Sequence, residues 1–195
     1  MKFQPHSIYH IYNQGNNQQQ LFFSDDDYIY FLQLYKTYIH PYVDTIAWCV
    51  LPNHFHFMIS VKENCVEVKQ GSLIMDSVSN GFRKLLSAYA HRFNSETKKS
   101  GSVFRPKTKA KELDSSGNIN YHINCFYYLH QNAVRHGLVT HASMWKFSSY
   151  HFYSGKRIKS LCNKKAAEEI CEYDIKTFET LVNIRLPGEL IDKLF

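Results

Sequence analysis

The run 51–60, Leu-Pro-Asn-His-Phe-His-Phe-Met-Ile-Ser, places two histidines one residue apart in an otherwise β-prone, apolar segment. Successive side chains of a strand point to opposite faces of a sheet. His54 and His56 therefore share one face, while Phe55 and Phe57 point the other way into a core. Two neutral imidazoles on a rigid strand make a good half-site for a divalent metal. A pair of ordinary hydrogen-bonded histidines is the alternative interpretation.

Length and composition indicate one folded unit with a basic surface. The chain has 195 residues, 44% of them hydrophobic and 15% aromatic, and a formal net charge of +6. A basic balance with many aromatics suits single-stranded nucleic acid, although a solubility charge and an aromatic core are the plainer explanations. Five cysteines without a C-x-x-C pair, no leader-like start and no long apolar run predict a cytoplasmic protein away from membranes.

The order of predicted elements matches a split β-α-β arrangement. We expect strands at 7–13, 43–51, 54–61 and 103–113, a polar loop at 62–72, and helices at 24–39, 75–94 and 119–136. The fold class is therefore α+β, with a ferredoxin/RRM-like four-stranded antiparallel sheet and helices on one side. The third helix is extra and could cover the histidine face. Residues 1–153 would form the domain, and 154–195 a C-terminal extension, helical in part and packed on it.

Basic residues recur at every second position of the fourth predicted strand: Arg105, Lys107, Lys109 and Lys111. On a strand they would all stand on one face, either as a row of phosphate contacts or as lysines that protect a sheet edge. Arg83 and Lys84 lie largely outside the apolar stripe of the second helix, and we add them to the predicted DNA-binding residues.

The third helix carries two stripes at helical spacing. One is apolar by composition and holds Ile119, Ile123, Phe126, Tyr127, His130 and Val134; the other is polar and holds Tyr121, Cys125, Tyr128, Asn132 and Arg135. If the polar stripe faces the histidines, the apolar one must pack on the C-terminal segment or on a second subunit that receives the tyrosine in trans. A monomer and a homodimer both remain open.

Two histidines and the Asn132 side-chain oxygen would give three protein ligands to a cation. Such a site suits Mg²⁺ or Mn²⁺ acting as a Lewis acid on a phosphodiester. A phenol is a weak nucleophile at neutral pH, so Tyr128 would need a polarised phosphate or a cation such as Arg135 nearby. Tyr127 with Gln131 is the alternative pair, and its place on the apolar stripe disfavours it.

Several short stretches together resemble one family. They are residues 9–17 (YHIYNQGNN), 51–56 (LPNHFH), 128–139 (YLHQNAVRHGLV) and 145–150 (WKFSSY). His-x-His followed by a helix with Tyr-x-x-x-Asn is similar to the single-tyrosine HUH transposases of insertion sequences, and closest to their REP-associated subgroup, the RAYT proteins. The chain departs from that pattern at Ala133, where the subgroup usually has proline, and at Pro106, within a loosely matching strand.

The resemblance implies a metal-dependent single-strand DNA endonuclease and strand transferase that recognises hairpin DNA. It makes His54, His56 and Asn132 metal ligands and Tyr128 the nucleophile, which would keep a 5′-phosphotyrosine bond and release a 3′-hydroxyl. The protein would act in the bacterial cytoplasm, associated with the nucleoid when bound to DNA.

Other functions are less consistent with these residues. A domesticated hairpin-binding protein that no longer cuts is the main alternative. A histidine-triad hydrolase would need a third histidine where Met58 stands, a two-histidine phosphoesterase would need two separate His-x-Ser/Thr strands, and an RNA-binding sheet would need aromatics where His54 and His56 lie.

Overall fold

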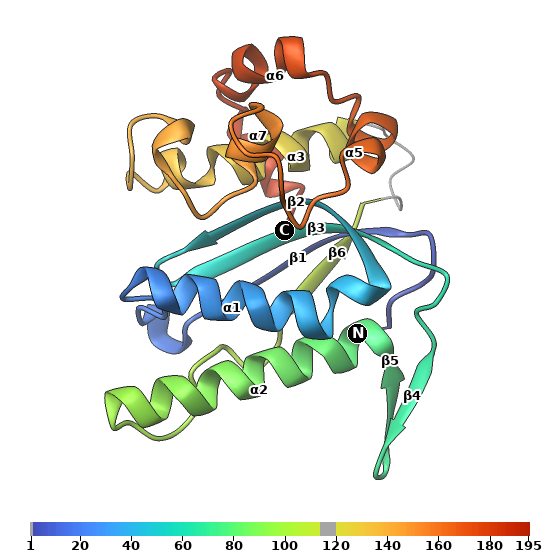
Figure 1. Cartoon of the computed structure of the whole chain (residues 1–195), viewed down its shortest axis with the longest axis vertical. Helices are drawn as coiled ribbons and strands as arrows, with labels where there is room; N and C mark the ends of the chain where they lie inside the picture. Colours follow the sequence, from blue (N-terminus) through green and yellow to red (C-terminus); the bar gives the residue numbers. More distant parts are fainter. Residues whose placement is uncertain (1, 114–119) are drawn as a thin grey trace.

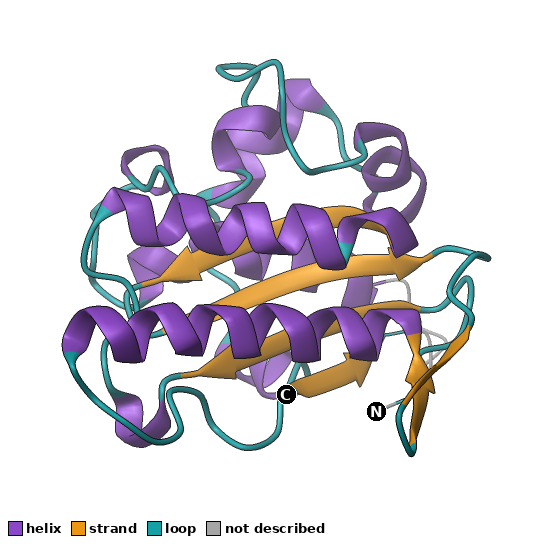
Figure 2. Ribbon diagram, turned by 60° about the horizontal axis from the view of Figure 1, so that its bottom comes forward, coloured by secondary structure: helices purple, strands orange, loops and turns teal. Residues whose placement is uncertain are grey.

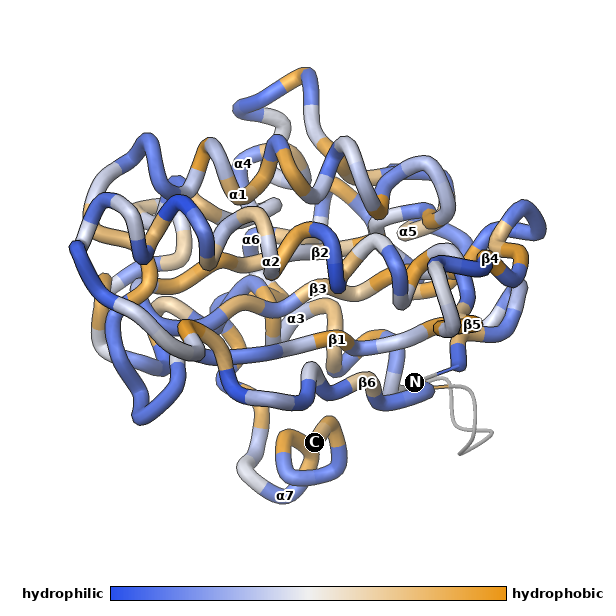
Figure 3. Tube along the Cα trace, turned by 90° about the horizontal axis from the view of Figure 1, so that it is seen from below, coloured by the Kyte–Doolittle hydropathy of each residue, from blue (hydrophilic) through white to orange (hydrophobic). Residues whose placement is uncertain are grey.

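The four-stranded antiparallel sheet predicted from the sequence is present. The computed structural model describes residues 2–113 and 120–195. The strands β1 (Ile8–Gln14), β2 (Val43–Leu51), β3 (His54–Val61) and β6 (Lys109–Glu112) lie in the order β2-β3-β1-β6, as Figure 3 shows from below. All neighbouring strands are antiparallel. This confirms the α+β, ferredoxin-like fold class.

Helices cover both faces of the sheet. The helices α1 (Asp25–Tyr38) and α2 (Ser77–Thr97) lie side by side across one face (Figures 1 and 2). The other face carries α3 (Asn120–Arg135) and the later helices (Figure 1). These later helices are α4 (Tyr150–Tyr153), α5 (Lys164–Cys171), α6 (Ile175–Val182) and α7 (Gly188–Asp192). The chain is thus a three-layer structure with the sheet in the middle.

The face under α1 and α2 is apolar because the strand alternation directs Phe55 and Phe57 into it. The Phe57 ring stacks on Tyr35 of α1 with centroids 4.0 Å apart. The two helices approach closely at Gly81, where an added Cβ would lie 2.3 Å from the Tyr38 carbonyl oxygen. Asp27 stabilises the start of α1, since its carboxylate accepts the Ser24 backbone N–H at 2.9 Å.

The apolar stripe of α3 packs on the C-terminal extension of the same chain. Phe126 makes ring contacts with Tyr153, Tyr173 and Phe178, and His130 contacts Phe178 as well. These residues belong to a core that also holds Met58 of the sheet. Of the two partners expected for this stripe, the structure shows the C-terminal segment.

Three details of the sequence prediction were wrong. The fourth strand, expected over 103–113, is only β6, so Arg105, Pro106 and Lys107 lie in a loop before it. The supposed loop 62–72 contains β4 (Glu67–Gln70), which pairs with β5 (Leu73–Asp76) as a ribbon that projects from the body (Figure 1). The second helix, expected over 75–94, begins only at Ser77, because Met75 and Asp76 belong to β5. The polar stripe of α3 is present, and its residues Cys125, Tyr128 and Asn132 are buried.

Short 3-10 turns connect the larger elements: Asn16–Gln18, His40–Tyr42 and Ala142–Met144. Gly137 follows α3 with φ of 67°, as expected for the glycine that ends a helix. The predicted start of that helix at Ile119 lies outside the described residues. Among those that are described, no helix has the length and apolar character needed to cross a bilayer.

Candidate active site

The sheet register gathers the predicted site residues on the face under α3. On β3, His54 pairs with Gln14 and His56 pairs with Tyr12. Tyr12 pairs in turn with Lys109 on the edge strand. Directly paired residues point to the same side of a sheet. The two histidines, Tyr12 and Lys109 therefore share one face, opposite to Phe55 and Phe57.

A pocket of about 380 Å³ opens at the histidine end of this face. His54 and His56 line it with ring centroids 5.2 Å apart. Tyr128 of the same chain also lines it, and its ring centroid lies 5.7 Å from that of His56. The predicted nucleophile and both predicted histidine ligands are thus brought together within one protomer.

A chain of hydrogen bonds fixes the tautomer of His56. The Leu194 carbonyl lies 3.0 Å from His10 Nδ1, and His10 Nε2 lies 2.9 Å from His56 Nδ1. A carbonyl can only accept, so the His10 proton must be on Nδ1 and His10 Nε2 accepts the Nδ1–H of His56. The Nε2 atom of His56 is left unprotonated. Burial lowers the pKa of His10 to about 4, which keeps this relay neutral.

His54 reaches the same state by a different contact. Its Nδ1 lies 2.6 Å from the side-chain oxygen of Asn53, which can only accept, so its Nε2 also keeps a lone pair. Burial lowers the pKa of His54 to about 4. Burial, followed by the neighbouring histidines, also lowers the pKa of His56. Both imidazoles are therefore neutral at pH 7, as metal ligands must be.

Asn132 and Tyr128 are one helical turn apart and both buried. Asn132 is fully enclosed, and neither its amide oxygen nor its amide nitrogen has a hydrogen-bond partner among the described residues. Burial, helped by the Cys125 thiol, raises the pKa of Tyr128, whereas the positive charge of Arg135 acts in the opposite direction. The phenol is protonated at neutral pH in this state.

These side chains fit a divalent cation by their chemistry. Two imidazole nitrogens with free lone pairs and one unsatisfied buried amide oxygen form a plausible donor set. Within the described part of the chain, no three His, Cys, Asp or Glu side chains are arranged as a metal site. The predicted third ligand, Asn132, is not among the residues that line the pocket.

The alternative pair, Tyr127 and Gln131, faces away from the histidines. The Tyr127 ring lies 6.3 Å from Phe178 of α6 by centroids. The Gln131 amide donates to the carbonyls of Val182 and Ile184, at 3.1 and 2.7 Å. Both side chains thus pack on the C-terminal extension.

The predicted DNA-binding residues lie in several different places, with Arg135 at the end of α3. Lys109 and Lys111 stand on the site face, since their partners Tyr12 and His10 do, and the Arg105 guanidinium contacts the Gln14 amide at the pocket. Arg83 and Lys84 are on α2, on the other side of the sheet, where Lys84 lies over the Tyr38 ring. Lys107 lies in the loop before β6.

Sequence reasoning missed three neighbours of the site. His10 was not considered, although strand alternation from Tyr12 would have placed it on the same face. The His136 ring lies 4.6 Å from that of His54 by centroids, one turn beyond Asn132. The Phe195 ring contacts Tyr12 and Tyr128 at 4.9 and 5.6 Å, and no sequence signal indicated that it would cover the pocket.

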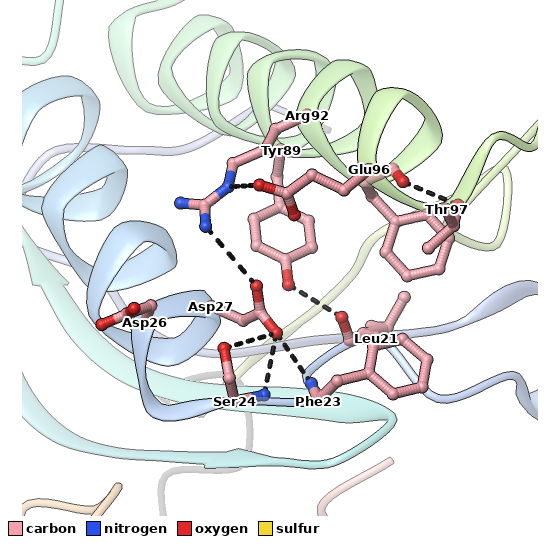
Figure 4. A pocket seen from close by; sticks show the side chains of 10 residues that line it. Leu21, Phe23, Ser24, Asp26, Asp27, Tyr89, Arg92, Glu96 and Thr97 are labelled. Atoms are coloured by element: carbon pink, nitrogen blue, oxygen red, sulfur yellow. Dashed lines mark hydrogen bonds and ion pairs between the residues drawn. The ribbon is translucent and has the colours of Figure 1, made fainter.

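A second pocket lies on the helix side, between α1 and α2 (Figure 4). There Arg92 bonds to Glu96 at 2.7 Å and lies 3.7 Å from Asp27. The Tyr89 hydroxyl donates to the Leu21 carbonyl. Arg92, Asp27 and Glu96 are paired with each other, so this pocket is best explained as part of the packing between the two helices.

Comparison with known proteins agrees with the motifs. No protein-family model matches the chain. A protein of Haemophilus influenzae named "Putative REP-associated tyrosine transposase" is 26% identical over 129 residues, which make up 64% of this chain and 70% of that protein. The REP-associated tyrosine transposase of Escherichia coli K12 is 24% identical over 105 residues, 54% of this chain and about half (53%) of the relative.

A solved structure extends the likeness to the fold. It is described as a REP-associated tyrosine transposase bound to a REP hairpin, and it superposes with a TM-score of 0.56 at 15% identity. The match covers 83% of this chain and 87% of the other. The similarity inferred from the motifs is confirmed by these comparisons: this chain is similar to REP-associated tyrosine transposases in sequence and in fold.

Proposed function

We propose that this chain is a metal-dependent endonuclease and strand transferase that cuts single-stranded DNA beside a hairpin, with Tyr128 as its nucleophile. One observation carries the proposal: Tyr128 and two histidines with free Nε2 atoms line one pocket of one protomer. The names of the two relatives support transposase chemistry, and the hairpin in the neighbouring structure supports the DNA partner.

The reaction would exchange one phosphodiester bond for another. The Tyr128 oxygen attacks phosphorus, the bond to the 3′ oxygen breaks, and a 5′-phosphotyrosine forms. The phenol loses its proton and the departing 3′ oxygen gains one. The energy of the broken linkage is kept in the new bond, so a 3′-hydroxyl can later reverse the step and join a strand.

The protein side chains would prepare this exchange. His54, His56 and Asn132 would hold Mg²⁺ or Mn²⁺, which when bound would supply Lewis-acid polarisation of the phosphate. The positive charge of Arg135 favours the phenolate form of Tyr128, against the effect of burial. His10 keeps the Nε2 atom of His56 unprotonated, and Lys109 and Lys111 stand on the side where a strand would enter.

The test is to trap the covalent intermediate. Wild-type protein is incubated with Mn²⁺ or Mg²⁺ and a labelled oligonucleotide that carries a hairpin and a single-stranded flank. We expect a denaturant-resistant adduct in which one DNA fragment is covalently attached to Tyr128, as peptide mass spectrometry would show. Tyr128→Phe should abolish the adduct, a fall of at least about 1,000-fold, because it removes the proposed nucleophilic oxygen.

Tyr127→Phe is the matched control, because it removes a hydroxyl from the adjacent residue, which faces α6. This variant should keep the adduct. Loss of the adduct in Tyr127→Phe but not in Tyr128→Phe would show that Tyr127 is the nucleophile and that the proposed assignment to Tyr128 is wrong. Hairpin binding with no adduct from the wild type, under either metal, would instead favour the domesticated binding protein.

A further inference from the structure

A third cavity lies next to the active site, where α3 meets the C-terminal extension. It has a volume of about 430 Å³ and lies between the end of α3 and the segment 183–187 that links α6 to α7. Arg135 enters it from α3 and Arg185 from the linker. The two arginines are 50 residues apart in the chain and are brought together only by the fold.

Neither arginine is neutralised. No described carboxylate lies within ion-pair distance of Arg135 or Arg185, and no acidic side chain lines the cavity. Burial and the positive charge of Arg185 lower the pKa of Arg135. The helix-side pocket of Figure 4 is the opposite case, since Arg92 there lies between Glu96 and Asp27. Two adjacent cations without a counterion create a local demand for an anion.

The linker that carries Arg185 is held in place. The Gln131 amide nitrogen bonds to two linker-side carbonyls, and its oxygen accepts the Leu186 N–H at 3.4 Å. Arg135 Nη1 donates to the Leu186 carbonyl at 3.2 Å. Only part of the Arg135 guanidinium is used by this contact, so its other N–H groups remain for a ligand. The Thr140 and Asn183 side chains add neutral polar groups to the lining.

The position of the cavity connects it with the proposed chemistry. Arg135 lies next to His136, which lines the histidine pocket, and its charge acts on the Tyr128 hydroxyl. A polyanion bound at the histidines and crossing the end of α3 would reach the arginine pair. Planar guanidinium groups match the oxygens of a phosphate, and their hydrogen bonds to it are charge-assisted.

We propose that Arg135 and Arg185 form a second phosphate site, which holds a backbone phosphodiester of the DNA strand outside the bond that is cut. The inference deepens the proposed function and rests on it for the identity of the ligand. Arg135 was already a predicted DNA contact, and the new elements are Arg185 and the role of the extension. The site gives residues 154–195 a part in holding the substrate.

The test measures binding without cleavage. Tyr128→Phe protein in EDTA is titrated into a labelled hairpin oligonucleotide with a single-stranded flank, at several salt concentrations. Adding Arg185→Ala should weaken binding about 5- to 10-fold. It should also reduce the slope of log affinity against log salt by about one, as expected for one lost phosphate contact. Lys176→Ala on α6 is the matched control, because it removes an exposed cation from the same extension outside the cavity.

Equal affinity and slope for Arg185→Ala and Lys176→Ala would overturn the second phosphate site and leave the Tyr128 chemistry standing. If the oligonucleotide does not bind even before Arg185 is changed, the proposed function fails. A titration with inorganic phosphate then decides the site by itself. Saturable NMR shifts confined to the Nε–H signals of Arg135 and Arg185 would support it, and weak shifts spread over all arginines would reject it.

Discussion

The two faces of the central sheet are built from the same strands but are stabilised by different contacts. On the helix face, Phe57 of β3 stacks on Tyr35 of α1, so the partners are two aromatic rings from the same half of the chain. On the site face, His56 and His10 are buried and must be hydrogen-bonded, and the relay ends at the carbonyl of Leu194, 184 residues after His10. Aromatic packing is prominent on the first face, whereas a network of hydrogen bonds orders the histidines of the second.

The comparison shows where function can be placed in a small α+β domain. On the helix face the buried Tyr35 hydroxyl is hydrogen-bonded within the protein, to the Thr45 hydroxyl at 2.7 Å. The site face holds imidazoles and an amide because long-range partners satisfy some of their atoms and leave others free. His56 Nε2 and the Asn132 amide are the atoms left free here. The C-terminal extension is therefore a structural part of the site.

The largest expected effect is a loss of folding stability, which compares an apolar packing residue with a hydrogen-bonded residue on β3. Phe57→Ala should lower the free energy of unfolding by about 4 kcal/mol, because it leaves a cavity beside Tyr35. His56→Ala should cost about 2 kcal/mol, since it leaves the buried His10 Nε2 without its partner. Urea denaturation of both variants measures the difference. Equal losses would show that the two faces are not energetically distinct.

A pH titration tests the buried histidines of the site side. Burial lowers the pKa of His130 to about 3 in the folded protein. In the unfolded chain the same side chain has a pKa of about 6.5, so it takes up a proton at higher pH there than in the folded state. Stability is unaffected above pH 6.5 and falls as the pH drops toward 3. At pH 5 the cost from His130 alone is about 2 kcal/mol.

The variant His130→Gln isolates this contribution. It can keep the hydrogen bond to Ser149, which His130 Nε2 makes at 2.7 Å, and it does not titrate. Chemical denaturation at pH 7 and pH 5 should then show a loss smaller by about 2 kcal/mol than in the wild type. An unchanged pH dependence would mean that His130 is not buried in its neutral form.

The smallest effect concerns the basic residues. Lys109→Ala should weaken hairpin binding about 3- to 5-fold and reduce its salt slope, because Lys109 stands on the site face at the sheet edge. Lys36→Ala, an exposed lysine of α1 on the other side of the sheet, should change neither. Fluorescence anisotropy over a salt series compares them. If the two variants behave alike, Lys109 serves only to protect the edge strand.

The fold was largely predictable because its signals are local. Alternation in 51–60, the Asp27 cap of α1 and Gly137 after α3 each depend on neighbouring residues. The error at 103–113 arose because alternating Arg and Lys in a solvent-exposed segment resemble a strand whether or not a partner strand is available. Only Lys109–Glu112 pair with β1. The β4–β5 ribbon was missed because its residues lack a clear alternation.

The site was predictable in part. His54, His56 and Tyr128 could be proposed from spacing, and the structure places them in one pocket. The burial of Tyr128 and Asn132 could not be foreseen, because it depends on how α3 docks on β2 and on Phe195. The roles of His10, His136 and Arg185 depend on contacts across more than 40 residues of sequence, for which periodicity carries no information.

Under the proposed function, the relay from Leu194 through His10 to His56 would couple cation affinity to the docking of the chain end that follows α7. When the last residues undock, His10 loses the acceptor that sets its tautomer, and His56 is no longer presented to a metal in one protonation state. By thermodynamic reciprocity, a cation that prefers the docked form would make the local opening of α7 less favourable by the same free energy. Binding of a cation to the histidines would thus increase the protection of the backbone amides of 188–192 against hydrogen exchange.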